Sequence, residues 1–189
     1  GAHPKCVGIG ECGLDFFKHN DGEAEAQLAA FKPQCSLAVE LGKALVIHGR
    51  LVTKANEDLM FRVMKEMIPQ EHRIHVHCYS DSLEHALELC AHWPNLRIGF
   101  TGSITFRDRP VERPGKPVAK AEKKGEHHSR DLIQGLPLDR LLIETDGPYM
   151  CPDPFRGQTA HPGHVHRVAE RIAEWKDKPL DEVMAATRQ

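Results

Sequence analysis

Short apolar runs alternate along this chain with longer segments whose apolar residues recur at helical spacing, and this alternation limits the possible folds more than any other feature. The runs predict strands at 7–10, 44–47, 73–77, 96–100 and 140–143. The longer segments predict helices at 23–41, 53–68, 82–92, 165–175 and 180–187. Because parallel strands need crossover helices between them, the pattern predicts an α/β fold with a parallel sheet.

A polar side chain that can take part in chemistry lies at the carboxyl end of each predicted strand or just beyond it. Because the carboxyl ends of parallel strands open on a common side, we expect these side chains to lie close together. In strand order they are Glu11, His48, His77, the segment 101–103, and Glu144 with Asp146.

Four of these residues, Glu11, His48, His77 and Asp146, form a mixture of carboxylates and imidazoles that suits divalent ions such as Mg²⁺, Mn²⁺ or Zn²⁺. Two such ions about 3.5–4 Å apart can activate a water molecule and stabilise an in-line displacement at phosphorus. A single histidine at a strand end is more often a structural residue held by hydrogen bonds. The metal interpretation therefore rests on the same placement recurring at successive strands.

Six segments, in this order and spacing, resemble the TatD family of metal-dependent deoxyribonucleases of the amidohydrolase superfamily. They are GIGECGLDFF (8–17), LVIHGR (45–50), HVHCYSDS (75–82), FTGSITF (100–106), LDRLLIETDGPYM (138–150) and PDPFRGQTAHPG (152–163). The HVHCYS and AHPG stretches are most similar to the eukaryotic TatD branch. The resemblance implies a TIM-type (β/α) barrel and an exonuclease-type hydrolysis of DNA phosphodiester bonds by a metal-activated water, with RNA as a further substrate to consider.

The resemblance also implies roles for individual residues. Glu11 matches the family's metal-bridging glutamate, and His48 and His77 match the two histidines on one metal ion. Asp146 matches the aspartate that binds metal and orients the attacking water, so Asp146 and Glu11 are the expected catalytic residues. The implied cofactors are divalent ions, two per complete site, with Mg²⁺ expected ahead of Mn²⁺ or Zn²⁺.

Four further charged residues lie in the matching segments. Arg50, in the H-x-R motif, is expected to contact phosphate. For Arg156, a substrate contact and a loop salt bridge are both open. Asp15 is expected to orient a neighbour or to be structural, and Glu144 is expected to lie deeper than the metal ligands because it precedes Asp146 by two residues.

The sequence departs from the family pattern before Glu11, where no H-x-H motif is found. Five strands are visible where a TIM-type barrel has eight, and 189 residues is fewer than the ~250 typical of such barrels. We therefore expect a single, partial TatD-like domain over residues 1–189, without roughly the first three strands of the barrel. One of its two metal sites would then be incomplete.

Two other functions are open. One is a different amidohydrolase-like reaction, such as metal-dependent ester or amide hydrolysis, because a binuclear site does not fix which bond is cleaved. The other is a truncated, non-catalytic paralogue that binds nucleic acid, and the missing H-x-H motif favours it.

Charge and cysteine content narrow the possible partners. The net charge of -2 gives no overall basic field, so nucleic-acid binding would need a local patch. The segment 107–130 has eight basic and four acidic residues, and we expect a loop or loosely helical excursion that either guides a phosphate backbone or is simply solvated.

No apolar run approaches the ~20 residues of a membrane span. The six scattered cysteines predict reduced thiols in an intracellular protein, cytoplasmic or nuclear.

Two C-terminal features have structural interpretations. One feature is the H-x-x-H-x-H spacing of His161, His164 and His166, which resembles a set of zinc ligands. No acid or cysteine is placed to complete a tetrahedral zinc site, so we expect these histidines at the rim of the site or on the surface. Tyr149 could contact substrate, yet an aromatic residue after a strand is often buried, and we expect it in the core.

Overall fold

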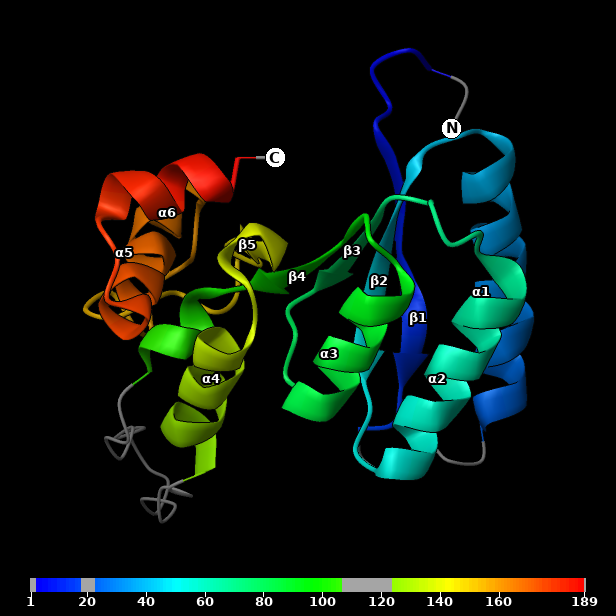
Figure 1. The fold of residues 1–189 in the computed structure, drawn as a ribbon, viewed down its shortest axis with the longest axis horizontal. Helices are drawn as coiled ribbons and strands as arrows, with labels where there is room; N and C mark the ends of the chain where they lie inside the picture. The colour runs from blue at the N-terminus through cyan, green and yellow to red at the C-terminus, as the bar shows by residue number, and fades with distance from the viewer. Residues whose placement is uncertain (1–2, 18–22, 107–123, 189) are drawn as a thin grey trace. The chain divides into compact units, whose positions relative to one another are not determined.

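The computed structural model describes residues 3–17, 23–106 and 124–188, with the side chains of 124–127 excepted. The chain divides into two compact units, Gly1–Gly99 and Phe100–Gln189, and each is described by itself (Figure 1). The expectation of a single domain over residues 1–189 stays a prediction.

The first unit alternates strands and helices in the predicted order. Its parallel pairs are β1 with β2, β2 with β3 and β3 with β4. The three helices between the strands are the crossovers that parallel pairing requires. The elements are β1 (Gly8–Asp15), α1 (Ala24–Glu40), β2 (Ala44–Arg50), α2 (Lys54–Met67), β3 (Ile74–His77), α3 (Leu83–His92) and β4 (Leu96–Phe100), whose last residue opens the second unit.

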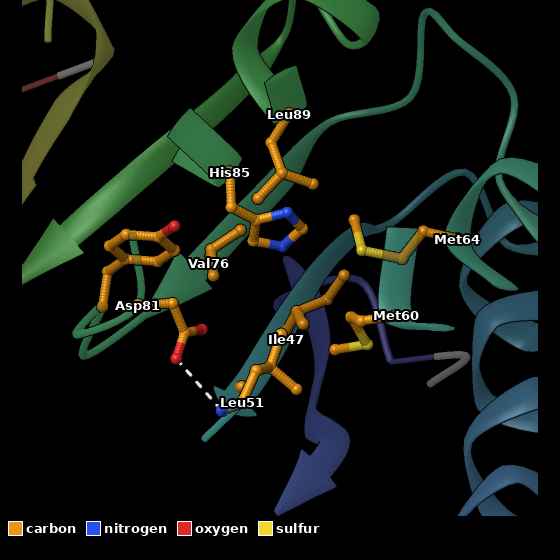
Figure 2. Close-up of a pocket in the computed structure, with 10 residues that line it drawn as sticks. Ile47, Leu51, Met60, Met64, Val76, Asp81, His85 and Leu89 are labelled. Carbon is orange, nitrogen blue, oxygen red and sulfur yellow. Dashed lines mark hydrogen bonds between the residues drawn. The ribbon is translucent and has the colours of Figure 1, made fainter. Parts of the chain in front are cut away.

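The two faces of this sheet differ in burial, and the difference follows the alternation of side chains along each strand. Ile47 of β2 and Val76 of β3 are buried, and they line a small cavity together with Met60 and other side chains from α2 and α3 (Figure 2). The alternate positions in the same strands, which include His48 and His77, are only half-buried. The helices therefore cover one face, and the histidines lie on the other, more open face.

Side-chain caps determine where α2 and α3 begin. Thr53 Oγ1 accepts the Asn56 N–H, and the Asn56 side chain accepts the Thr53 N–H in return, which is a reciprocal capping box. Ser82 Oγ accepts the N–H of His85. Each helix therefore begins one residue later than predicted, because the capping residue itself has a non-helical conformation.

β1 and β2 are longer than the sequence predicts, so Glu11 and His48 lie within strands and not just beyond them. β1 continues to Asp15 and β2 continues to Arg50, and these two residues are paired in the ladder. The apolar runs end earlier because glycines and polar residues make up the extensions. The prediction that strands one and two end at Glu11 and His48 was therefore wrong.

The second unit packs helical segments around one short strand, β5 (Leu141–Ile143). Its core is apolar, with Leu132, Ile172 and Val183 almost completely buried. The other elements are η2 (Gly102–Thr105), α4 (Lys124–Gly135), η3 (Leu138–Arg140), η4 (Pro162–His164), α5 (Val165–Lys176) and α6 (Leu180–Ala186).

The predicted excursion at 107–130 is only partly described. Residues 107–123 lie outside the described residues, so the expectation of a basic loop there stays a prediction. From Lys124 onward the chain is a regular helix, so of the two expected forms, a loop or a loosely helical excursion, this part has the helical one. The reason is the apolar group of Leu132, Ile133 and Leu136, which is buried in the core of the second unit.

The predicted α/β class is confirmed. The strand order in the first unit is β1-β2-β3-β4, and in the second unit the Glu144 N–H, just after β5, donates to the Phe100 carbonyl at 3.0 Å. Across the part of the chain that the structure describes, no helix has the length and apolar character needed to cross a membrane.

Candidate metal centre

An extra residue in β1 places Glu11 on the open face of the first unit's sheet. The ladder pairs Ile9 with Leu45 and Cys12 with Ile47, so three steps along β1 match two steps along β2. Such a bulge changes the face to which the following side chains point. Cys12 therefore lies on the helix-covered face, and Glu11 lies on the open one.

Two glycines allow β1 to approach β2 this closely. Gly10 has a φ of 143°, and a Cβ there would lie 2.4 Å from the Val46 carbonyl oxygen. At Gly13 a Cβ would lie 1.8 Å from the carbonyl oxygen of His48. A side chain at either position would push the strands apart, so the two glycines are needed to bring β1 close to the backbone of Val46 and of His48.

The first acid–imidazole pair crosses the open face from β1 to β3. Glu11 Oε2 lies 3.2 Å from His77 Nε2. The Glu11 side chain is 52% exposed and the His77 side chain only 13%. The imidazole is therefore held by its surroundings, while the carboxylate is open to a ligand from solvent.

The second acid–imidazole pair lies at the carboxyl ends of β1 and β2. Asp15 Oδ2 lies 3.3 Å from His48 Nε2 and 3.5 Å from Arg50 Nη1, and Asp15 Oδ1 accepts the Phe17 N–H at 2.8 Å. The Arg50 guanidinium lies over the Phe17 ring, 4.9 Å from its centroid. Asp15 thus contacts both an imidazole and a guanidinium at this edge.

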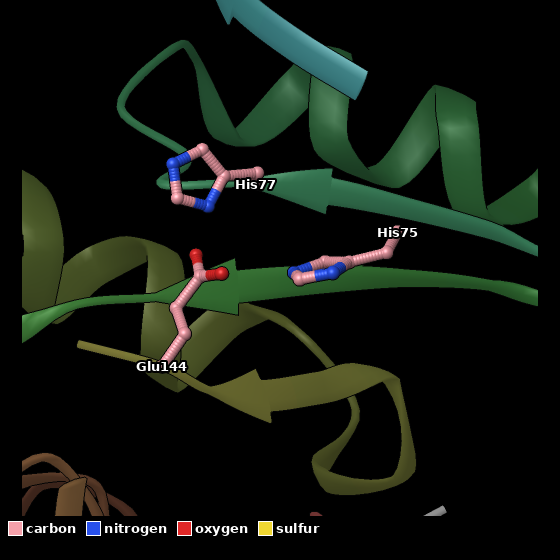
Figure 3. Close-up of side chains that lie close together, drawn as sticks. All are labelled: His75, His77 and Glu144. Carbon is pink, nitrogen blue, oxygen red and sulfur yellow. The ribbon is translucent and has the colours of Figure 1, made fainter. Parts of the chain in front are cut away.

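The imidazoles of His48 and His77 are neighbours because the two residues are paired in the ladder. Their ring centroids are 6.5 Å apart. His75 leaves the same side of β3 as His77, with a centroid separation of 6.2 Å (Figure 3). Three imidazoles and two carboxylates therefore share the open face of the first unit.

This donor set fits a divalent ion bound by oxygen and nitrogen. His48 Nδ1 is buried and has no hydrogen-bond partner among the described residues, while Nε2 of the same ring faces Asp15. A carboxylate on one ring nitrogen orients an imidazole for metal binding through the other. Cys12 is buried on the helix-covered face, and this burial, with a smaller effect of the Glu11 charge, raises its pKa to about 11.

Asp146 and Glu144 lie in the second unit, just beyond β5. Asp146 has a left-handed φ of 51°, which aspartate tolerates better than most residues, and its carbonyl accepts the Tyr149 N–H at 2.9 Å. Glu144 follows the last residue of β5 directly (Figure 3). Tyr149 is 70% exposed, so the prediction of a core position was wrong; it lies in the turn that follows Asp146 rather than in a strand.

Arg156 also lies in the second unit, stacked on an aromatic ring. Its guanidinium carbon is 3.8 Å from the centroid of Phe106, which follows η2. Thr105 Oγ1 accepts the Asp153 N–H at 2.8 Å and ties the loop that carries Arg156 to η2. The stacking holds the guanidinium in place, and the predicted substrate contact stays a prediction.

The histidine cluster has a different character from the one predicted. His161 and His166 are exposed, as expected, but His164 is buried. It stacks on Phe155 with a centroid separation of 5.0 Å, and its Nδ1 lies 3.5 Å from Cys151 Sγ. Burial, with the neighbouring imidazoles, lowers the pKa of His164. The surface role was therefore wrong for His164, because aromatic packing makes it a core residue.

Two residues of the open face do not follow a predicted strand directly. Asp15 lies well beyond the strand predicted at 7–10, and His75 lies inside the strand predicted at 73–77. Alternation along an extended strand would have found both, since residues two positions apart point to the same face.

Comparison with known proteins identifies the family. The family described as TatD related DNase matches residues 1–189. The human 3'-5' RNA nuclease TATDN2 is 34% identical over 190 residues, which cover 99% of this chain and 22% of that protein. The uncharacterized metal-dependent hydrolase YabD of Bacillus subtilis is 35% identical over 189 residues, which cover 100% of this chain and 64% of that protein.

A solved structure gives the same result. The crystal structure of YJJV, a TatD homolog from Escherichia coli, matches with a TM-score of 0.74 and 29% identity over 96% of this chain and 60% of that one. The chain spans less than two thirds of each of these three proteins. Its parallel strands and helices correspond to the TIM-barrel-type fold of the TatD structures, as predicted. On the match of its whole length, this chain belongs to the TatD-related DNase family.

Proposed function

We propose that this chain is the part of a metal-dependent nuclease that carries most of its metal ligands, and that the enzyme hydrolyses phosphodiester bonds of DNA from a chain end. The observation that carries the proposal is the two acid–imidazole pairs on one open face, Glu11 with His77 at 3.2 Å and Asp15 with His48 at 3.3 Å. The family match supports the reaction, and the name of the RNA nuclease TATDN2 makes RNA the second substrate to test.

Glu11, His48, His77 and Asp146 are the proposed metal ligands, with two ions per complete site and Mg²⁺ preferred. When bound, the ions supply Lewis acidity and a water molecule of lowered pKa. The Glu11 carboxylate is half exposed, so its oxygens are accessible to metal ions, as a bridging ligand requires. For Asp146 the support is the family motif at 138–150 and its position after the carboxyl end of a strand.

Proton transfer and phosphate binding are the proposed tasks of three further side-chain groups. Asp146 would orient the attacking water and accept its proton. Arg50 and Arg156 would donate hydrogen bonds to phosphate oxygens, for which a planar guanidinium is well suited. Their contacts with Phe17 and Phe106 support this assignment, because the stacked guanidinium groups lose little freedom when they bind.

An intracellular place of action, cytoplasmic or nuclear, belongs to the same proposal. No disulfide joins any of the six cysteines in the part of the chain that the structure describes. Reduced thiols are typical of proteins in reducing compartments.

The test is nucleotide release from single-stranded DNA and from RNA, with Mg²⁺ and with EDTA, by the wild-type chain and by Asp146→Asn. The matched control is Asp139→Asn, which removes an exposed carboxylate from η3. We expect Mg²⁺-dependent release that Asp146→Asn abolishes and Asp139→Asn preserves. Absence of release from both nucleic acids would contradict the proposal, and hydrolysis of a carboxylic ester instead would favour a different amidohydrolase-like reaction.

A further inference from the structure

We propose that Asp81 is a positioning residue of this site, which holds the carboxyl end of β2, with His48 and Arg50, against the loop that follows His77. The effect on catalysis rests on the proposed nuclease function. The positioning itself does not, because it concerns contacts within the first unit.

The need for such a residue arises where the β2–β3 ladder ends. The last pair between these strands is His48 with His77, and the next residue of the β3 chain, Cys78, turns away with a left-handed φ of 47°. β2 runs on to Arg50, whose carbonyl accepts the Phe16 N–H on the β1 side at 3.1 Å. Among the described residues, the ladder between β2 and β3 extends along β2 only as far as His48.

Asp81 supplies the missing acceptor. The Leu51 N–H, one residue beyond β2, donates to Asp81 Oδ1 at 3.0 Å (Figure 2). Both residues are buried, and a buried N–H without an acceptor would be costly. The carboxylate therefore continues the pairing of β2 by one step past the end of β3.

The same carboxylate also packs against the strand before Arg50. Asp81 Oδ2 lies 3.4 Å from the point that a Cβ on Gly49 would occupy. Asp81 thus contacts the chain on both sides of Arg50, at Gly49 and at Leu51. This leaves the backbone that carries Arg50 little freedom to move.

The loop that carries Asp81 is itself anchored to the rest of the unit. The Tyr79 N–H donates to the Gly99 carbonyl at 2.9 Å, and the Ser82 N–H donates to Glu57 Oε1 at 3.1 Å. The Tyr79 hydroxyl donates to the Ser82 carbonyl at 2.7 Å. Asp81 therefore ties the end of β2 to a loop fixed on β4 and α2, and a positioning role requires such a fixed base.

The chemistry of the cavity argues in the same direction. The residues that line the cavity include one acid, Asp81, and one imidazole, His85, and most of the others are apolar. A buried carboxylate is costly in such surroundings, and an apolar side chain would fill the space more favourably. The carboxylate contributes what an apolar residue cannot, which is the acceptor for Leu51.

The experiment compares Asp81→Ala, which removes the acceptor, with Asp81→Asn, which keeps an oxygen at the same place. Glu84→Gln, an exposed acid on α3, is the control for loss of one negative charge. The measurements on the whole chain are amide hydrogen exchange at Leu51, the side-chain NMR resonances of His48, and Mn²⁺ affinity by calorimetry.

We expect Asp81→Ala to accelerate Leu51 exchange about tenfold, to shift the His48 resonances and to weaken Mn²⁺ binding about tenfold. Asp81→Asn should restore all three to within about twofold, and Glu84→Gln should change none. Wild-type exchange at Leu51 as fast as at the exposed Val52 would overturn the proposal even if Asp81→Ala fails to fold. Unchanged His48 resonances in a folded Asp81→Ala would overturn it too. A wild-type chain that binds no Mn²⁺ would contradict the nuclease function, while exchange and resonances would still decide the positioning.

Discussion

Replacing Asp81 with asparagine should make the protein more stable at neutral and alkaline pH and leave its stability in acid little changed. Burial of Asp81 raises its pKa from 3.8 to about 7, the Glu57 charge adds to the increase, and the hydrogen bond from Leu51 opposes it. The carboxyl group therefore binds its proton more tightly in the folded than in the unfolded chain. Asparagine has the same shape and does not titrate.

The magnitude follows from the difference in pKa between the two states. A difference of about three units corresponds to a free energy of about 4 kcal/mol, at about 1.4 kcal/mol per unit. Because the folded pKa is raised, the wild-type stability is complete below about pH 4 and falls as the pH rises towards about 7, where the folded carboxyl loses its proton. The difference in free energy of unfolding between Asp81→Asn and the wild type should therefore grow with pH. Above about pH 7 it should be larger than its value in acid by up to about 4 kcal/mol.

The assay is urea unfolding of the two proteins by circular dichroism, at intervals from about pH 4 to about pH 8. Other titrating groups cancel in the difference between the proteins, provided that they keep their own pKa values. The groups whose pKa values the substitution could change most are Glu57, His85 and Tyr79, because each is buried near Asp81. Glu84→Gln should give a curve parallel to that of the wild type. Parallel curves for Asp81→Asn and the wild type would refute the reasoning, because Asp81 would then have an ordinary pKa.

Three further predictions concern stability and thiol reactivity in the first unit. Gly13→Ala should lower the free energy of unfolding by about 2–3 kcal/mol, because the new Cβ would overlap a backbone carbonyl of β2. Gly42→Ala has only a left-handed φ against it and should lower the free energy of unfolding by about 1 kcal/mol. Equal losses of the two variants in urea unfolding would contradict the close approach of β1 to β2. Iodoacetamide at neutral pH should leave Cys12 and Cys35 unmodified, because burial raises their pKa to about 11 and about 12, and peptide mapping that finds either one labelled in folded protein would disprove this. Thr53→Ala should destabilise the fold by about 1 kcal/mol through loss of the α2 capping box, and an unchanged unfolding free energy would show that the cap contributes nothing.

The positions of the strands could be predicted because apolar runs fix which backbone segments are buried. The run at 44–47 and the strand pattern at 73–77 located β2 and β3, and their alternation explains why His48 and His77 share a face. Where each strand ends was less predictable. The ends of β1 and β2 are held by backbone pairing and by the Asp15–Arg50 contact, neither of which leaves an apolar signal.

The placement of Glu11 shows a second limit. A regular strand would put Glu11 on the same face as Ile9, which the helices cover, and the bulge alone moves it to the open face. Glycine at position 10 is compatible with a bulge but does not require one, so the sequence pattern could not decide. His164 shows a third limit, since its burial depends on Phe155 and Cys151, contacts that form only after folding.

The most direct test of the central claim is an NMR titration of the whole chain with Mn²⁺, a paramagnetic ion that broadens resonances close to it. Wild-type protein should lose the imidazole signals of His48 and His77 first, while that of His92, which lies on α3 against Phe61 of α2, persists. Glu11→Gln should weaken the effect by about 10–100-fold, and Glu66→Gln, which alters an exposed acid paired with Lys32, should not change it. Broadening that spares His48 and His77, or that is the same in Glu11→Gln as in the wild type, would contradict the assignment of the metal centre to the open face of this sheet.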